Sequence, residues 1–319
     1  MKAADDRIFI SVIKQYYELG ISQEEIAAKE YISKSTVSRI INKAVKNGYV
    51  QFKLCYPIVS STELKKQLME QFELENAVVT PVYVDDARLI LIDVCKAAVQ
   101  DIKTFVEDGD IIGVSWGRTL EQLADCLDDY QNDKKDIVTV QTNGFVAGDV
   151  QSIQSSATIS KFQRAFAAEG YLLPVPIFLD SKETATALMN DSKIKPMMDL
   201  CRRASLAILS VGAFSSRSVV LERGVLSPED YERLAQCGTV GDLCSRYFDI
   251  NGKIANEDMD QRTLGLSLDD LRKIRRRMAL AVGPKKAKAT IGALRTGAIT
   301  HLYTDENTAQ EIIKLSRQL

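Results

Sequence analysis

Residues 33–46, SKSTVSRIINKAVK, place hydrogen-bonding side chains along one face of a predicted helix. The apolar residues Val37, Ile40, Ile41, Ala44 and Val45 recur at helical spacing and form a single stripe. The opposite face carries hydroxyl, amide and cationic groups without a carboxylate, which suits contacts to DNA phosphates and base edges. The candidate DNA-contacting residues are Ser33, Lys34, Ser35, Thr36, Ser38, Arg39, Asn42, Lys43 and Lys46.

Charge is unevenly distributed along the chain. Residues 29–53 hold six cations and one anion, a net charge of +5, whereas the whole chain has −2 and the remainder therefore −7. A basic stripe on a mildly acidic protein indicates a nucleic-acid partner. The alternative is an ordinary surface hairpin with a solvated basic face. The run SKSTVSR argues against it, because small hydroxyl residues stand where a helix N-terminus can meet a phosphate.

A second candidate site is the segment SWGRT, residues 115–119, which joins an apolar strand-like run to a predicted helix. Its glycine permits close backbone approach, and the helix N-terminus supplies N–H groups and a positive dipole for a phosphate or carboxylate. The spacing is neither that of a Walker loop nor that of a dinucleotide fingerprint. The alternative is a tight turn that binds nothing. The candidate residues are Ser115, Trp116, Gly117, Arg118 and Thr119.

Three further segments could complete this site: QTNG at 141–144, GDLCSR at 241–246 and GPKK at 283–286. Carboxylate and amide groups recognise sugar hydroxyls, whereas lysine and backbone N–H groups recognise phosphate. Each segment alone could be a capped helix or a solvated loop, but together they favour an anionic sugar ligand. Their candidate residues are Gln141, Asn143, Gly144, Asp242 and Lys286.

A helix-turn-helix would position the DNA-contacting face. Ser22 and Glu25 form a capping box that starts the first helix, Ser33 has the position of the second N-cap, and Gly48 ends the second helix. A helix over 5–19 packs against the pair, and VQFKLCY after Gly48 predicts a strand consistent with a wing. Residues 1–56 therefore form a DNA-binding domain, and residues 57–319 the ligand-binding and oligomerisation domain.

The remaining chain alternates between strand and helix patterns, which predicts an α/β domain with a parallel sheet covered on both faces. Ligands bind such sheets beyond the carboxyl ends of the strands, where the SWGRT segment and its companions lie. Strands are expected near 76–84, 110–114, 137–141, 171–175, 205–211, 277–282 and 299–303, and helices near 62–74, 87–108, 118–128, 155–168, 182–203, from Ser227-Pro228, 285–295 and 305–317.

Composition excludes several classes of protein. The start MKAADDRIF is not a signal peptide, and no apolar run is long enough for a membrane span, so we expect a cytoplasmic protein. The six cysteines are dispersed and predict buried free thiols rather than a metal or redox site. The single histidine, His301, lies on a predicted strand and is interpreted as structural. We expect neither a metal nor a cofactor.

These segments together resemble the SorC family of bacterial sugar-responsive transcriptional regulators, over nearly the whole chain. The resemblance is carried by EEIAAKEYISKSTVSRII, DGDIIGVSWGRTL, YLLPVPIF, GDLCSRYFDINGK and GPKKAKATIGALRTGAITHLYTDENTA. It implies a winged-helix-like N-terminal domain, a Rossmann-like C-terminal domain related to sugar-phosphate isomerases, and assembly as dimers or tetramers. It also implies that Gly117 to Thr119 and Lys286 hold phosphate while Asp242 faces the sugar.

Two departures from the family pattern affect these expectations. Glu30-Tyr31 replaces the family's Leu-Gly before the turn, and because Glu30 cannot fill a buried leucine site, Tyr31 is expected to pack there. The deoxyribonucleoside regulators of the family carry a Schiff-base lysine in a QLKGG segment, where this chain has QTNGF with Asn143. An amide cannot form an imine, so the expected ligand binding is noncovalent.

Three functions remain open from the sequence. The first is a regulator whose operator binding changes with a sugar or sugar phosphate. The second is a sugar-phosphate isomerase with a DNA-binding extension, which would need a general base other than histidine, such as Asp242. The third is a constitutive DNA-binding protein whose large domain only forms oligomers. The anion-binding residues favour the first, which is not an enzyme.

Overall fold

The computed structural model describes residues 3–52, 60–127, 130, 132–145, 150–215 and 226–319. The chain divides into two compact units, Met1–Pro57 and Ile58–Leu319, and each is described here by itself. In the described residues, no helix is both long enough and apolar enough to cross a membrane.

The N-terminal unit is a bundle of three helices, α1 (Ala3–Tyr17), α2 (Gln23–Lys29) and α3 (Lys34–Lys46). Ser22 and Glu25 make the expected capping box on α2, and the Ser33 side chain accepts a hydrogen bond from the Thr36 N–H at the start of α3. The expected strand after Gly48 is absent over residues 50–52, and the rest of it lies outside the described residues.

The expectation that Tyr31 packs in the turn is wrong. Its side chain is 94% exposed, and its backbone is left-handed with φ +54°. Glu30 instead accepts hydrogen bonds of 2.6 Å from both Ser11 and Gln15 of α1. The polar residue is therefore satisfied by polar partners on α1, and the turn needs no apolar side chain from its second position.

The larger unit is built on a sheet in the order β1-β9-β8-β5-β2-β3-β4, in which every neighbouring pair is parallel. The strand order reverses between β5 and β2, and ligand sites of open α/β sheets lie at such a switch point. The strands are β1 (Asn76–Thr80), β2 (Ile111–Val114), β3 (Val138–Gln141), β4 (Glu169–Tyr171), β5 (Leu206–Ala213), β8 (Arg276–Ala281) and β9 (His301–Asp305).

Strict strand–helix alternation fails where a hairpin of β6 (Thr239–Leu243) and β7 (Arg246–Asp249) is inserted. Strand β6 runs antiparallel to the far end of β5, so that Asp242 lies opposite Gly212. Asp242 was expected just beyond a parallel strand but belongs to this hairpin. Strand β4 is also shorter than expected from YLLPV, and β1 stops at Thr80.

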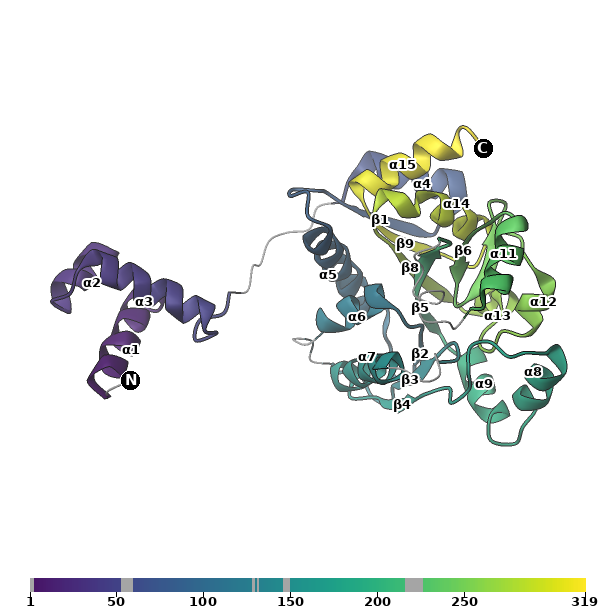
Figure 1. Cartoon of the computed structure of the whole chain (residues 1–319), viewed down its shortest axis with the longest axis horizontal. Helices are drawn as coiled ribbons and strands as arrows, with labels where there is room; N and C mark the ends of the chain where they lie inside the picture. The colour runs from purple at the N-terminus through teal and green to yellow at the C-terminus, as the bar shows by residue number, and fades with distance from the viewer. Residues whose placement is uncertain (1–2, 53–59, 128–129, 131, 146–149, 216–225) are drawn as a thin grey trace. The chain divides into compact units, whose positions relative to one another are not determined.

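Helices cover both faces of the sheet (Figure 1). The side chains of β8 alternate between the two cores, with Met278 and Leu280 facing α5, α6 and α7, and Ala279 and Ala281 facing the other layer. The helices are α4 (Thr62–Phe72), α5 (Ala87–Phe105), α6 (Arg118–Asp125), α7 (Val150–Phe166), α8 (Lys182–Met189), α9 (Lys195–Arg202), α11 (Pro228–Gln236), α12 (Glu257–Gln261), α13 (Leu268–Lys273), η1 (Pro284–Lys286), α14 (Ala287–Arg295) and α15 (Glu306–Ser316).

The single histidine and most cysteines of the described chain are enclosed in the larger unit. His301 lies on β9, where its Nδ1 is 2.8 Å from the Thr300 hydroxyl. The described cysteines are free thiols; Cys95, Cys201 and Cys244 are buried, as the sequence predicts, whereas Cys126 is half-buried and Cys237 is exposed. Cys55 lies outside the described residues.

Candidate functional site

Helix α3 presents the polar face that the sequence predicts. Val37, Ile41 and Ala44 are buried, and Val37 and Ile41 join Val12 and Ile26 in the small core. Val45 departs from the predicted stripe, since 38% of it is exposed. Thr36 and Ser38 are half-buried, and the other seven candidate DNA-contacting residues are exposed: Ser33, Lys34, Ser35, Arg39, Asn42, Lys43 and Lys46.

Several of these polar groups already have partners within the unit. The Ser33 hydroxyl lies 2.8 Å from the hydroxyls of Ser35 and Thr36, so these groups help to cap α3. Lys34 forms an ion pair with Glu24 of α2. A DNA phosphate must therefore compete with Glu24 for Lys34, whereas Arg39 has no such carboxylate neighbour among the described ion pairs.

The larger unit contains a cavity of about 280 Å³ at the carboxyl ends of β2 and β5. Six of the predicted ligand residues line it together: Ser115, Trp116, Arg118, Asn143, Asp242 and Lys286. Seven other lining residues were not predicted from the sequence: Ser210, Gly212, Ala213, Ser215, Cys244, Ser245 and Tyr247. Inspecting the end of the predicted strand 205–211 would have found Ser210 and its neighbours. No sequence pattern pointed to Tyr247.

One side of the cavity is cationic. Gly117 is the N-cap of α6 with φ +136°, a conformation that L side chains rarely adopt, and the exposed Arg118 follows it as the first helical residue. The Lys286 ammonium reaches in from η1 and donates a 2.9 Å hydrogen bond to the Val211 carbonyl. Burial lowers the pKa of Lys286, which the nearby Asp242 carboxylate opposes. These groups suit an anion such as phosphate.

The other side of the cavity holds hydrogen-bond acceptors. A Cβ on Gly212 would lie 1.9 Å from an oxygen of Asp242, so only glycine lets this carboxylate pack against β5. Burial raises the pKa of Asp242 to about 6, against the lowering effects of the Ser245 N–H bond and the Lys286 charge. Asn143 donates from its amide to the Ser245 hydroxyl at 3.2 Å. Carboxylate and amide oxygens are suited to sugar hydroxyls.

The turn between β6 and β7 holds these acceptors in place. Its two central residues, Cys244 and Ser245, have φ of +52° and +65°. Both angles are left-handed, as in type I′ hairpin turns that usually carry Asn-Gly, so this backbone is strained. In this conformation the Ser245 N–H donates a hydrogen bond to an Asp242 oxygen at 3.1 Å. Because the turn lacks glycine and asparagine, sequence reasoning did not find the hairpin.

Four predicted ligand residues support the cavity without lining it. The Gln141 amide donates to the Asn143 carbonyl at 2.7 Å, and Gly144 accepts a 3.1 Å bond from the Trp116 indole. Gly117 caps α6, and Thr119 is buried in its first turn. These contacts fix the loops after β2 and β3 relative to each other.

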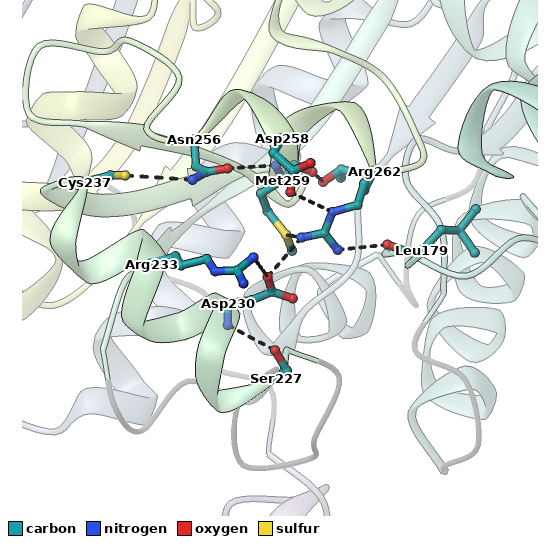
Figure 2. Close-up of polar contacts among 10 residues, drawn as sticks. Leu179, Ser227, Asp230, Arg233, Cys237, Asn256, Asp258, Met259 and Arg262 are labelled. Atoms are coloured by element: carbon teal, nitrogen blue, oxygen red, sulfur yellow. Dashed lines mark hydrogen bonds and ion pairs between the residues drawn. The ribbon is translucent and has the colours of Figure 1, made fainter. Parts of the chain in front are cut away.

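A buried arginine, Arg262, joins α11 to α12 (Figure 2). Arg262 donates to Asp230 of α11 at 2.9 Å, to Asp258 of α12 at 3.0 Å and to the Leu179 carbonyl at 2.9 Å. Asp230 also lies 3.8 Å from the exposed Arg233. Behind Tyr247, Leu226, Leu234 and Met259 form a small apolar cluster. Arg262 thus connects α11 and α12, which lie behind the Tyr247 wall of the cavity.

Known proteins share both units of this chain. A family model described as "Putative sugar-binding domain" matches residues 56–314, and a winged helix-turn-helix DNA-binding model matches residues 20–51. The chain belongs to the SorC family of transcriptional regulators.

Individual members of the SorC family align over almost their whole length. The deoxyribonucleoside regulator of Bacillus subtilis is 30% identical over 98% of this chain and 99% of its own. The sorbitol operon regulator of Klebsiella pneumoniae is 27% identical over 98% of this chain and 100% of its own. The full-length structure of that regulator covers 98% of this chain with a TM-score of 0.72 and 26% identity. The chain is therefore a helix-turn-helix regulator with a sugar-binding domain, and its relatives are named as regulators rather than as enzymes.

Proposed function

We propose that the larger unit binds a sugar phosphate noncovalently and that this binding changes the affinity of α3 for operator DNA. The observation that carries the proposal is the two-sided cavity, with Arg118 and Lys286 facing an anion and Asp242 and Asn143 facing hydroxyls. A cavity of about 280 Å³ suits one phosphorylated monosaccharide better than a nucleotide or a disaccharide. Asn143 stands where the deoxyribonucleoside regulators of the family carry a Schiff-base lysine, and an amide cannot form an imine, which favours noncovalent binding.

The cavity supports binding rather than turnover. Sugar isomerisation needs both a base and a second proton donor near neutral pH. Asp242 is the single carboxylate among the described lining residues, and His301, the chain's one histidine, lies elsewhere on β9. A coupled assay that detected isomerase turnover would contradict this part of the proposal.

We propose further that the active protein is a cytoplasmic homo-oligomer, a dimer or a tetramer, which places two α3 helices on successive half-sites of an operator. To read a two-fold symmetric operator, the two α3 helices must contact one face of the duplex at half-sites about 34–36 Å apart. Light scattering on the full chain with and without DNA measures the assembly. A monomer on DNA would contradict it.

The first experiment is a titration of the full chain with a panel of sugars and their phosphates. Trp116 is the chain's single tryptophan and lines the cavity, so its fluorescence reports binding directly. A ligand at one hundred times its Kd should also stabilise the protein by roughly 2.7 kcal/mol. A response to a phosphorylated sugar but not to its free form supports the proposal, whereas a response to free sugars alone contradicts the anion-binding role of Arg118 and Lys286. If Schiff-base reduction with borohydride trapped a covalent adduct, the noncovalent mechanism would be wrong.

A further inference from the structure

A second buried arginine connects the segments that carry the hydroxyl-facing groups of the cavity. Arg246 begins β7 directly after Ser245, and only 5% of it is exposed. Its guanidinium donates to the Gly265 carbonyl at 2.9 Å and to the Leu266 carbonyl at 3.0 Å, and it pairs with Asp260 of α12 at 3.1 Å. Because the guanidinium is planar and its N–H groups point in fixed directions, these contacts hold the backbone before α13 against the hairpin. Arg246 is not one of the described residues that line the cavity.

The backbone that Arg246 holds pairs with the loop after β3 on both sides of Asn143. The carbonyl before Asn143 accepts a 2.8 Å hydrogen bond from the Leu266 N–H, and the N–H after Asn143 donates to the Leu264 carbonyl at 3.0 Å. Between these bonds, Asn143 and Gly265 form an antiparallel bridge. A Cβ on Gly265 would lie 2.6 Å from the Asn143 Cα, so no side chain separates the two backbones. The position of Asn143 therefore depends on the segment that Arg246 holds.

The same arginine is joined to Asp242 through the turn of the hairpin. Ser245, its neighbour in the chain, accepts a 3.2 Å hydrogen bond from the Asn143 amide and donates its own N–H to Asp242 at 3.1 Å. Arg246 is thus connected to both hydroxyl-facing groups, although Asn143 and Asp242 come from distant parts of the sequence. A shift of its guanidinium would change the spacing between them.

We propose that Arg246 is a positioning residue that sets the spacing of Asn143 and Asp242, so that the cavity discriminates a sugar phosphate from inorganic phosphate. This inference rests on the proposed function. The two anion-facing cations, Arg118 of α6 and Lys286 of η1, belong to elements that the described hydrogen bonds of Arg246 do not reach. A change at Arg246 should therefore weaken recognition of the hydroxyls and leave the affinity for phosphate unchanged.

Three variants test this role. Arg246→Lys keeps the positive charge beside Asp260, but an ammonium cannot donate to two carbonyls and a carboxylate in one plane. Asp260→Asn is milder, because it removes one charged partner and keeps both carbonyl bonds. Arg276→Lys is the matched control, since Arg276 is also partly buried and donates to a backbone carbonyl, that of Phe105 at 3.2 Å, but begins β8 at the opposite end of the sheet from the cavity. Circular dichroism checks that each variant has the native fold.

The first measurement needs no ligand. The indole of Trp116, the chain's single tryptophan, donates at 3.1 Å to the carbonyl of Gly144, in the loop that pairs with the segment held by Arg246. The full chain labelled with fluorotryptophan gives one fluorine NMR signal, which should shift in Arg246→Lys, shift less in Asp260→Asn and keep its wild-type position in Arg276→Lys. A wild-type signal in folded Arg246→Lys, or an equal shift in Arg276→Lys, overturns the positioning role. If Arg246→Lys does not fold, the presence or absence of the shift in Asp260→Asn decides.

The second measurement titrates Trp116 fluorescence with inorganic phosphate, glucose 6-phosphate, fructose 6-phosphate and ribose 5-phosphate. Wild type should bind at least one of the sugar phosphates more tightly than inorganic phosphate. Arg246→Lys should reduce this ratio of affinities by roughly tenfold, as for the loss of one hydrogen bond, without a change for inorganic phosphate, and Arg276→Lys should keep the ratio. An unchanged ratio in Arg246→Lys, or a parallel loss for inorganic phosphate, overturns the inference. If wild type binds none of the four compounds, the proposed function fails, and the fluorine signal still decides whether Arg246 positions the loop.

Discussion

The DNA-contacting helix and the ligand cavity are built in opposite ways. All nine candidate residues of the first site lie within fourteen consecutive positions, and one amphipathic helix with a serine cap presents them. The cavity collects its residues from the loop after β2, the start of α6, the loop after β3, the end of β5, the β6–β7 hairpin and η1, which are far apart in the sequence. A change in α3 should therefore act locally, whereas the cavity should also respond to changes in elements that never touch the ligand.

The largest effect that tests this difference is expected from Arg262→Met, a substitution behind the cavity wall. Arg262 is the buried cation that pairs with both Asp230 and Asp258. Because removing one partner of a buried ion pair leaves the other uncompensated, the unfolding free energy of the larger unit should fall by about 3 kcal/mol. Denaturant unfolding followed by circular dichroism measures the loss. Arg233→Met is the matched control, since Arg233 is exposed and only 3.8 Å from the same Asp230, and it should change stability by less than about 0.5 kcal/mol. Equal effects would mean that the wall does not depend on the buried arginine.

A smaller effect is expected from Arg118→Ala, inside the cavity. The loss of a charge-assisted hydrogen bond to phosphate should weaken sugar-phosphate binding by about 2 kcal/mol, or roughly 30-fold, and should leave operator binding without ligand unchanged. Trp116 fluorescence gives the first value and a gel-shift assay the second. Arg118→Lys keeps the charge but loses the planar fork, so its affinity should fall between those of wild type and the alanine variant. An unchanged response in Arg118→Ala would remove this residue from the site.

Arg39→Ala should act on DNA alone, because its side chain is exposed on α3. If Arg39 reads a guanine, the loss is about 1–3 kcal/mol and confined to one base position. Lys46→Ala is the comparison, since a phosphate contact weakens binding to all sequences and flattens the dependence on salt. Fluorescence anisotropy with operator variants at matched salt measures both. A uniform loss in Arg39→Ala would show that Arg39 contacts the backbone instead of a base.

The pH dependence of stability tests the cavity from its carboxylate side. The folded protein retains the Asp242 proton up to a pKa of about 6, whereas the unfolded chain releases it near the ordinary value of 3.8. Between these values the folded state binds more protons, so the unfolding free energy falls as pH rises through this range. Because each pKa unit corresponds to about 1.4 kcal/mol, Asp242→Asn should lack a fall of about 3 kcal/mol, measured by denaturant unfolding. The exposed Asp133→Asn should keep it, and an identical profile in both variants would refute the raised pKa.

The same difference between the two sites explains which features could be predicted from the sequence alone. Local sequence patterns were enough to predict the helix caps at Ser22, Glu25 and Ser33, because capping and helical periodicity depend on residues a few positions apart. They were also enough to predict the parallel sheet and the placement of Ser115 and Lys286 at strand ends. Sequence patterns failed where residues distant in the sequence determine a side chain's position. Glu30 accepts hydrogen bonds from α1, and Asp242 is positioned by a strained turn and by a glycine on another strand. Tyr247 enters the cavity through packing that no local pattern encodes.

The smallest expected effect belongs to the local site, and it tests whether α3 is truly independent of its surroundings. Lys34 is paired with Glu24, and both side chains are more than half exposed, so solvent screens the pair and its loss should scarcely change stability. Glu24→Gln releases Lys34 toward phosphate and removes a negative charge beside the DNA, so operator affinity should rise by less than about 1 kcal/mol and the salt dependence should steepen. Glu18→Gln is the control, because Glu18 is equally exposed but pairs with Lys14 of α1. Anisotropy titrations at several salt concentrations separate the two variants. Equal gains in both would attribute the effect to net charge alone, and a loss in Glu24→Gln would show that the pair orients Lys34 for DNA.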